Sequence, residues 1–566
     1  MRLATTFALA CGLLARALAA QEADLVVYGR VWTGDSSRLW AEALAIRGDR
    51  ILAVGTRAEI AGHVGRRTTV RDERGRFVMP GFIDNHTHFS QAGALLLGVN
   101  LLDVNDDGAL VRRVREAQGR MPRGAWLVGG EWGAYAAWAQ GSTGRDAAPG
   151  AAAAAPWRPG RAVLDSITRE TPVLLGKWDR SEFLANALAL ERSRVGCQVA
   201  GVECEGGEPT GRLSPEAAAR VRAAIPPKSF EQRLAEARVA LADLLRHGVT
   251  SIHDNTSPEQ FAVFEALRRR GELTVRVYAR PTLDRQAALR AVGIPRGFGD
   301  TWIRYGGLKG FVDGIMGNSS ARFYEPYLTS GRRGDWRTMM TEPPGMLPLL
   351  LAADSAGYWP QVHAIGDEAI DTLLTMFEHV FAANPARERR WRVIHAQVLR
   401  GPDVAARMAR LGIIAEVQPY HAIDDMRWME QRIGARSRWA YAFRTLQRAG
   451  VRLSFGSDWP GTNASWYTSN PLHGVYAAVT RQTLDGQPAA GWFPEERVDV
   501  EAALRAYTVN NAWAAGEEDL KGALRAGLLA DLVVLSDDPF AVPPSRLKDI
   551  RPTLVLVGGR VAFEAR

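Results

Sequence analysis

The sequence predicts an α/β fold: a TIM-like (β/α)8 barrel, a small composite β-sandwich domain built from both termini, and a large insertion after barrel strand 1. Three observations indicate it. Between residues 79 and 515, strand-like runs alternate with helix-like segments, which is typical of parallel sheets. Eight strand candidates can be ordered there, the number that closes a barrel. Both chain ends carry short β-type runs instead.

The eight strand candidates are short apolar runs, and helix-like stretches such as 230–246 and 402–411 separate most of them. The span between the first two is long enough for an insertion of about residues 100–230, which we expect to cover the barrel mouth. In chain order the candidates are residues 82–88, 249–255, 275–280, 303–311, 359–363, 391–395, 412–418 and 451–458.

The chain ends carry the second predicted domain. Residues 25–70 alternate short β-type runs with glycine turns, and residues 531–561 repeat that style. Neither end is large enough to bury a core alone, so we expect one composite β-sandwich. The resulting division is a signal peptide at 1–20, the composite domain at 21–78 and 516–566, and the barrel at 79–515.

The first twenty residues resemble a secretory signal. Arg2 supplies a positive start, residues 3–14 an apolar core, and residues 17–20 a small-residue cleavage site. The apolar run is too short to cross a bilayer, and no other segment looks transmembrane. We therefore expect an exported protein, periplasmic or secreted, without a membrane span.

Composition argues against nucleic acid as a partner. The formal charge is +8 over 566 residues, and no basic face interleaved with aromatics can be traced.

Of the three cysteines in the sequence, Cys11 would leave with the signal peptide. Cys197 and Cys204 could close a small disulfide loop in an oxidising compartment or remain free thiols, and the sequence leaves both open.

The stretch from Val78 to Phe89 carries the first chemical signal. Its apolar start predicts a buried strand, and Pro80-Gly81 marks the turn into it. Alternate side chains of a strand point the same way, so His86 and His88 share one face. Two imidazoles at a strand end can chelate one divalent ion such as zinc. Alone, so short a motif also occurs by accident.

Further ligand-type residues end later strands. In a barrel, the C-terminal strand ends point into one shared site. Each of these residues also has an ordinary structural explanation. The lysine could lie on the surface or pair with Asp313, the histidines could be buried in the core, and the aspartate could cap a helix N-terminus. Ligand types at five strand ends are far less expected by chance than at one. After His86 and His88, these residues are Lys309, His363, His395 and Asp458.

Taken together, these stretches resemble the amidohydrolase superfamily, in its YtcJ-like branch (amidohydrolase family 3). The resemblance covers nearly the whole chain after the signal, and as a set the motifs are highly specific. The matching segments are PGFIDNHTH at 80–88, LKGFVDG at 308–314, HAIGD at 363–367, VIHAQ at 393–397, FGSD at 455–458 and GLLADLVVL at 527–535.

The resemblance implies one or two divalent metal ions, zinc being the usual one, and a small-molecule substrate. By family pattern the His-x-His pair and Asp458 bind the first ion, and His363 and His395 bind the second. Lys309, converted to a carbamate by CO2, bridges them. The metals lower the pKa of bound water, hydroxide attacks a polarised carbonyl, and Asp458 shuttles the proton. The family alone also suggests a homodimer.

One segment departs from the family pattern. Relatives commonly show Asp-Gly-His ahead of an Asn-x-x-Ala-Leu segment, whereas this chain has Asp179-Arg180-Ser181 ahead of Asn186. Ser181 stands where a pocket histidine is expected, which leaves the substrate class open. Arg180 could hold an anionic group, although a surface or structural role is commoner. Other substrate-contact candidates, with packing as the alternative, are His253, His421, Trp132 and Trp459.

We therefore expect a metal-dependent hydrolase of carbon–nitrogen bonds other than peptide bonds, acting on a small amide, formamide or cyclic amide. Asp458 and His395 are its expected catalytic residues. The same site could act on an ester, lactone or carbamate, because hydroxide attacks each carbonyl. An exported binding protein without turnover is the third interpretation, and the proton shuttle argues against it.

Overall fold

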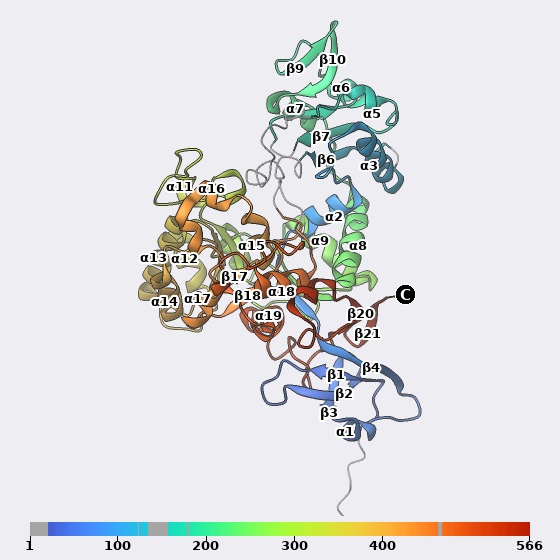
Figure 1. The fold of residues 1–566 in the computed structure, drawn as a ribbon, viewed down its shortest axis with the longest axis vertical. Coiled ribbons are helices and arrows are strands. Elements are labelled where there is room, and N and C mark those ends of the chain that lie inside the picture. The colour runs from blue at the N-terminus through green and yellow to red at the C-terminus, as the bar shows by residue number, and fades with distance from the viewer. Residues whose placement is uncertain (1–20, 123, 134–156, 178–179, 462–466, 566) are drawn as a thin grey trace, which may run out of the picture.

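The computed structural model describes residues 21–565 except 123, 134–156, 178–179 and 462–466, and it shows an α/β protein with two parallel sheets at its centre (Figure 1). The predicted signal peptide lies outside the described residues. Among the described helices, none is both long and apolar enough to cross a membrane.

The two parallel sheets carry the predicted barrel strands. The first has the order β13 (Ile303–Tyr305), β12 (Arg276–Ala279), β11 (Val249–Asp254), β5 (Phe82–Thr87). The second has the order β14 (Leu308–Phe311), β15 (Pro360–Ala364), β16 (Arg392–His395), β17 (Ile414–Val417), β18 (Leu453–Phe455), and neighbouring strands are parallel in both.

The single strand predicted over residues 303–311 is wrong, because the chain divides there into β13 and β14, which lie in different sheets. The break falls at two glycines, against which interior side chains pack closely. A Cβ on Gly306 would lie 2.0 Å from the ring of Tyr278, and one on Gly307 would lie 2.1 Å from the Gln361 side chain. Only glycine allows the backbone to pass there.

Backbone hydrogen bonds also connect the ends of the two sheets. His88 N donates to Trp459 O at 2.8 Å, and Asp458 N donates to His86 O at 2.9 Å, which joins the end of β5 to the segment after β18. At the other junction, Lys309 N donates to Pro281 O at 2.9 Å. The strand ends that carry the candidate ligands therefore face a common region.

Helices surround these sheets and bury their apolar faces in one large core. In α8 (Phe230–Arg246), for example, Ser229 caps the N-terminus and Leu234, Leu241 and Leu244 are buried. The other helices of this part are α2 (Phe89–Leu97), α9 (Pro258–Arg270), α10 (Gln286–Ala291), α11 (Thr338–Thr341), α12 (Met346–Ser355), α13 (Asp367–Ala383), α14 (Pro402–Arg410), α15 (Pro419–Asp425), α16 (Met429–Ile433), α17 (Phe443–Arg448), α18 (Pro471–Thr480), α19 (Val500–Ala506) and α20 (Val509–Ala515).

Strands from both chain ends form one seven-stranded sheet, at the bottom of Figure 1. The chain leaves this sheet for β5 at Gly81, where a Cβ would lie 2.3 Å from the Thr250 side chain. The order is β21 (Arg560–Glu564), β20 (Pro552–Val557), β19 (Leu532–Leu535), β4 (Thr69–Pro80), β1 (Leu25–Trp32), β2 (Trp40–Arg47), β3 (Arg50–Gly55), with α1 (Arg57–Ala61) after β3.

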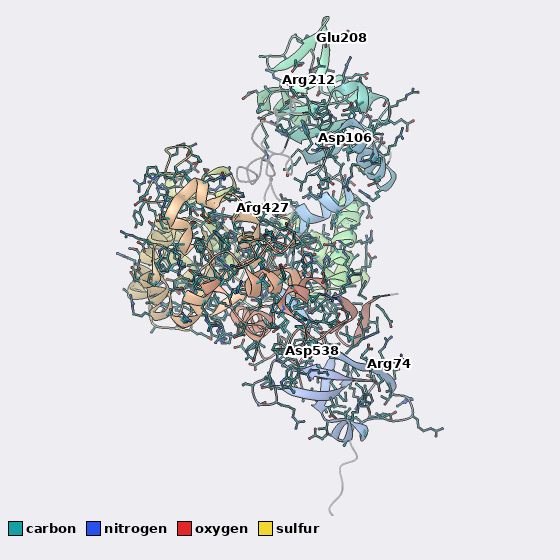
Figure 2. The ribbon with its side chains drawn as sticks, viewed as in Figure 1. Arg74, Asp106, Glu208, Arg212, Arg427 and Asp538 are labelled. Carbon is teal, nitrogen blue, oxygen red and sulfur yellow. A yellow bond between two sulfur atoms is a disulfide. The ribbon has the colours of Figure 1, made fainter. Side chains whose placement is uncertain are left out.

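The insertion forms a lobe of its own, at the top of Figure 1, with separate apolar clusters. Figure 2 places Asp106 and Arg212 on this lobe and Arg427 on the central part. Cys197 and Cys204 form a disulfide, which decides between the two alternatives left open above. The described elements of the insertion are α3 (Asp107–Arg120), β6 (Leu127–Trp132), α5 (Arg161–Asp165), β7 (Val173–Lys177), β8 (Phe183–Ala185), α6 (Ala187–Ser193), β9 (Val202–Glu205), β10 (Glu208–Leu213) and α7 (Pro215–Ala223).

Candidate metal centre

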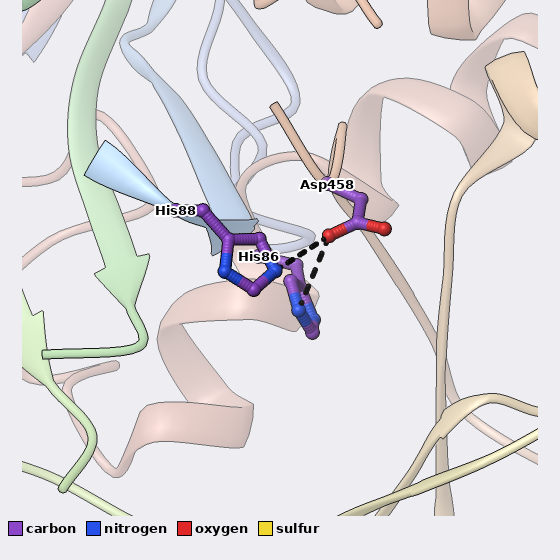
Figure 3. Close-up of side chains that lie close together, drawn as sticks. All are labelled: His86, His88 and Asp458. Atoms are coloured by element: carbon purple, nitrogen blue, oxygen red, sulfur yellow. Dashed lines mark ion pairs between the residues drawn. The ribbon is translucent and has the colours of Figure 1, made fainter. Parts of the chain in front are cut away.

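His86, His88 and Asp458 meet at the end of β5 (Figure 3). Asp458 Oδ1 lies 3.4 Å from His86 Nε2 and 3.0 Å from His88 Nε2. The two rings are 5.4 Å apart between centroids, as the alternation of a strand predicts. Although His88 and Asp458 lie 370 positions apart in the chain, their side chains are direct neighbours.

Asp458 is held in an unusual backbone conformation. Its φ is +58°, in the left-handed region, and its N–H donates to His86 O. The carboxylate is almost fully buried. Burial alone would raise the pKa of Asp458, but the neighbouring imidazoles of His86 and His88 lower it well below its ordinary value. The side chain is therefore ionised and able to serve as a ligand.

A second group consists of His395, His421 and the same carboxylate. His395 ends β16 and its Nδ1 lies 2.7 Å from Gln418 Oε1, so its Nε2 is left for a ligand role. His421, on α15, has Nε2 3.8 Å from Asp458 Oδ2. Burial lowers the pKa of His421 to about 4, which keeps the imidazole neutral. Sequence reasoning placed His421 among substrate contacts, whereas its position here is that of a candidate ligand.

His363 lies beside this second group. It is the next-to-last residue of β15, and its ring centroid is 4.6 Å from that of His395. Its Nε2 lies 2.9 Å from the carbonyl oxygen of Gly314 and 3.4 Å from Asp313 Oδ1. Among the described residues, the two compact ligand groups do not include it. Because Nε2 of His363 is engaged by the Gly314 carbonyl oxygen, Nδ1 is the nitrogen that remains for the predicted ligand role.

Lys309, in β14, lines the same cavity as these histidines. Its side chain is buried, and its Nζ lies 4.7 Å from the centroid of the Phe311 ring. Burial, together with the charge of Arg280, lowers the pKa of Lys309 to about 7. A large share of this amine is therefore unprotonated near neutral pH, which is the form that reacts with CO2.

Beneath the histidines lies a buried charged network that sequence reasoning missed. Glu416 Oε1 is 2.9 Å from His86 Nδ1, and Arg280 and Arg392 each approach the same carboxylate at 2.8 Å. The signal that could have found it is a single carboxylate inside the apolar strand β17, since buried carboxylates require partners. His253 belongs to this network: its Nδ1 accepts from Arg392 at 3.0 Å, and it does not line the cavity.

All six predicted metal ligands line one cavity of about 200 Å³. Its remaining wall mixes apolar and polar side chains, among them Phe311, Met316, Gln397, Trp428 and Tyr467. No described residue of the insertion lines it.

The other predicted substrate contacts lie elsewhere. Trp132 is buried in an apolar cluster of the insertion, and Trp459 is fully buried in the large core. Arg180 lies 3.8 Å from Glu131, and Lys177 Nζ donates to Ser181 Oγ at 3.3 Å, both within the insertion. None of these residues lines the cavity.

The residues present fit a divalent cation. Asp458 Oδ1 and His421 Nε2 are buried without a hydrogen-bond partner, although other ligand-type atoms surround them. Atoms that crowd together without bonding one another are expected where a cation lies between them. Neutral imidazoles and an ionised carboxylate are the donors that zinc prefers.

Known proteins resemble this chain over most of its length. A family model described as "Amidohydrolase family" matches residues 69–563. LONG AFTER FAR-RED 3 of Arabidopsis thaliana is 32% identical over 91% of this chain and 87% of its own length. YtcJ of Bacillus subtilis is 27% identical over 87% and 89%.

An N-substituted formamide deformylase of Arthrobacter pascens is 26% identical over 95% of this chain and 98% of its own length. Among solved structures, an uncharacterized metal-dependent hydrolase of Pyrococcus furiosus superposes with a TM-score of 0.71. That protein is 27% identical, over 91% of this chain and 99% of the other. The similarity therefore extends along almost the entire chain.

Proposed function

Because this chain belongs to the amidohydrolase family, as its motifs predicted, we propose that it is a metal-dependent hydrolase that cleaves a carbon–nitrogen bond of a small amide, formamide or cyclic amide. The observation that carries the proposal is the meeting of His86, His88, Lys309, His363, His395 and Asp458 in one cavity. These residues come from five strands or the segments that directly follow them, spread over 373 positions of the chain, and packing of an ordinary core does not require that arrangement.

The proposed metal centre holds one or two divalent ions, with zinc as the expected metal. His86, His88 and Asp458 would hold the first ion, and His395 with His421 or His363 would hold the second. Such an ion supplies a water of lowered pKa and polarises the substrate carbonyl. Lys309 as a carbamate adds a carboxylate between the two groups, and the lowered pKa of its buried amine supports this modification.

Asp458 is the proposed proton acceptor and donor. Its carboxylate reaches both groups of imidazoles, with Oδ1 near His88 and Oδ2 near His421. The carboxylate takes the proton released when water attacks the carbonyl and passes it to the leaving nitrogen. His395, fixed by Gln418, orients the carbonyl side of the site. The neutral imidazole of His421 cannot replace Asp458 as the base while it serves as a ligand.

The N-substituted formamide deformylase supports a formamide or related amide as substrate. Esters, lactones and carbamates are the alternative substrates, because the same site can attack any polarised carbonyl.

We also propose that the two parallel sheets close into one (β/α)8 barrel and that both chain ends form one sandwich domain. We further propose that the mature protein is exported and that it forms a homodimer. The backbone hydrogen bonds between β5 and the segment after β18 support the closure.

A substrate panel with metal analysis tests the proposal. The purified full chain is assayed with N-substituted formamides, cyclic amides and esters, and its zinc content is measured by plasma mass spectrometry. We expect near-stoichiometric metal and amide hydrolysis that is lost in His86→Ala. His379→Ala changes an exposed histidine on α13 and should leave both unchanged. Binding of the panel without hydrolysis, in protein full of metal, would instead indicate a binding protein.

A further inference from the structure

A second cavity, of about 530 Å³, opens beside the candidate metal centre. It lies between the beginning of α9, the helix α10 and the end of β13. Its wall is largely apolar and includes Phe261, Pro281, Ala288, Leu289, Val292 and Tyr305. The cavity around the metal ligands, by contrast, includes five histidines, two aspartates and three basic side chains in its lining.

The two cavities adjoin. Lys309 and Phe311 line both of them, so the side chain at the centre of the metal site is also part of the apolar cavity's wall. Asn255 lines the apolar cavity as well, and its Nδ2 lies 3.2 Å from His86 Nε2 and 3.4 Å from His88 Nε2. A molecule held at the metal site therefore lies directly beside the apolar cavity, within reach of its wall.

The apolar wall is open to solvent in part. Val292 is 70% exposed, while Phe261 and Tyr305 pack against each other at 4.8 Å between ring centroids. Exposed apolar surface next to a polar reaction site is typical of ligand-binding clefts. Two arginines, Arg280 and Arg285, also line the cavity, and their positive charge disfavours a cationic group there.

We propose that this cavity is the subsite for an uncharged apolar substituent of the substrate, aromatic or alkyl, carried on the nitrogen of the amide whose carbonyl reacts at the metal centre. The inference rests on the proposed function and specifies its substrate class. The shared wall residues Lys309 and Phe311, together with Asn255 beside His86 and His88, place the subsite next to the reacting atoms. The apolar wall favours an apolar substituent, and the basic side chains disfavour a cationic one.

A graded substrate series tests the subsite. Formamide and its N-methyl, N-butyl and N-benzyl derivatives are assayed with the zinc-loaded full chain. We expect kcat/KM to rise about three- to fourfold for each methylene buried. Ala288→Trp fills the cavity from an exposed position of α10 and should reduce kcat/KM at least tenfold for N-benzylformamide, with less than a twofold change for N-methylformamide. Ala291→Trp, on the same helix outside the cavity, is the matched control.

A binding measurement separates the two proposals. In Asp458→Asn, which should not turn over substrate, N-benzylformamide should raise the melting temperature more than formamide does, and adding Ala288→Trp should remove that difference. No hydrolysis of any panel member, with the difference in binding retained, overturns the proposed function alone. Equal effects of Ala288→Trp on kcat/KM for all substrates would overturn the subsite. An Ala288→Trp variant that keeps the substrate selectivity but no longer forms a dimer would also overturn it, because the cavity would then be an interface between copies of the chain.

Discussion

Glu416 Oε1 lies 2.9 Å from His86 Nδ1, and this contact determines which nitrogen of His86 faces the metal site. Burial alone would raise the pKa of Glu416, but Arg280 and the hydrogen bond from His86 lower it well below its ordinary value. An ionised carboxylate can only accept, so the Nδ1–H of His86 donates to it. The lone pair of Nε2 is then directed toward Asp458 and the site.

Glu416→Gln should weaken metal binding. The substitution keeps the volume but removes the charge that fixes His86 and that pairs with Arg280 and Arg392. Loss of such a partner costs about 10- to 100-fold in metal affinity or activity. Competition with a zinc chelator measures the affinity. Glu378→Gln changes a carboxylate of α13 outside the cavity and serves as the control. Equal zinc affinity in both variants would contradict the role assigned to Glu416.

Asp458→Asn should abolish proton transfer while its neighbours remain in place. The amide cannot accept the proton of the attacking water, and general acid–base catalysis contributes about 10²- to 10⁴-fold. We therefore expect kcat to fall by that factor when the assay contains excess zinc, which separates lost catalysis from lost metal. Circular dichroism checks the fold. A variant that retains more than a tenth of the activity would show that another group moves the proton.

Asp425 should make the protein less stable as pH rises. It is buried on α15, where burial and the nearby charge of Asp424 raise its pKa to about 8, and Gln397 Nε2 donates to it at 2.8 Å. Because the folded state binds this proton more tightly than the unfolded state, the stabilisation is complete below the unfolded pKa of 3.8. It is then lost as pH rises toward about 8.

Asp425→Asn removes this titration. The free energy of unfolding of the wild type, minus that of the variant, should therefore decrease from pH 5 to pH 8, by up to about 1.4 kcal/mol per pH unit. Urea denaturation at several pH values measures the difference, with Asp403→Asn at an exposed position as control. A difference that is constant over this range would show that Asp425 is not the group that titrates.

Asp531→Asn should destabilise the connection between the central part and the terminal sheet. Arg276, in β12, forms a bidentate pair with Asp531 at 2.6 and 2.9 Å, and both side chains are buried. Removing one partner leaves a buried charge uncompensated, which costs about 3–5 kcal/mol. Urea denaturation should show this loss, whereas Asp72→Asn, which breaks an exposed pair with Arg57, should show no measurable change.

The sequence by itself determined the repeating pattern of strands and helices and the identity of the ligand-type residues at strand ends. His86 and His88 illustrate this, because the alternation of a strand is a local property that two positions suffice to reveal. The division of residues 303–311 into two strands was missed, since it depends on Tyr278 and Gln361 packing against Gly306 and Gly307 from other strands.

Only the tertiary structure decided which residues share the site. It brings His421 to Asp458, places Glu416 behind His86, and leaves Trp132 and Arg180 in a lobe apart from the cavity. The physical reason is that a local pattern fixes the direction of a side chain relative to its own strand or helix. The distance between side chains hundreds of positions apart is set by strand order and register, which arise only when the whole core packs.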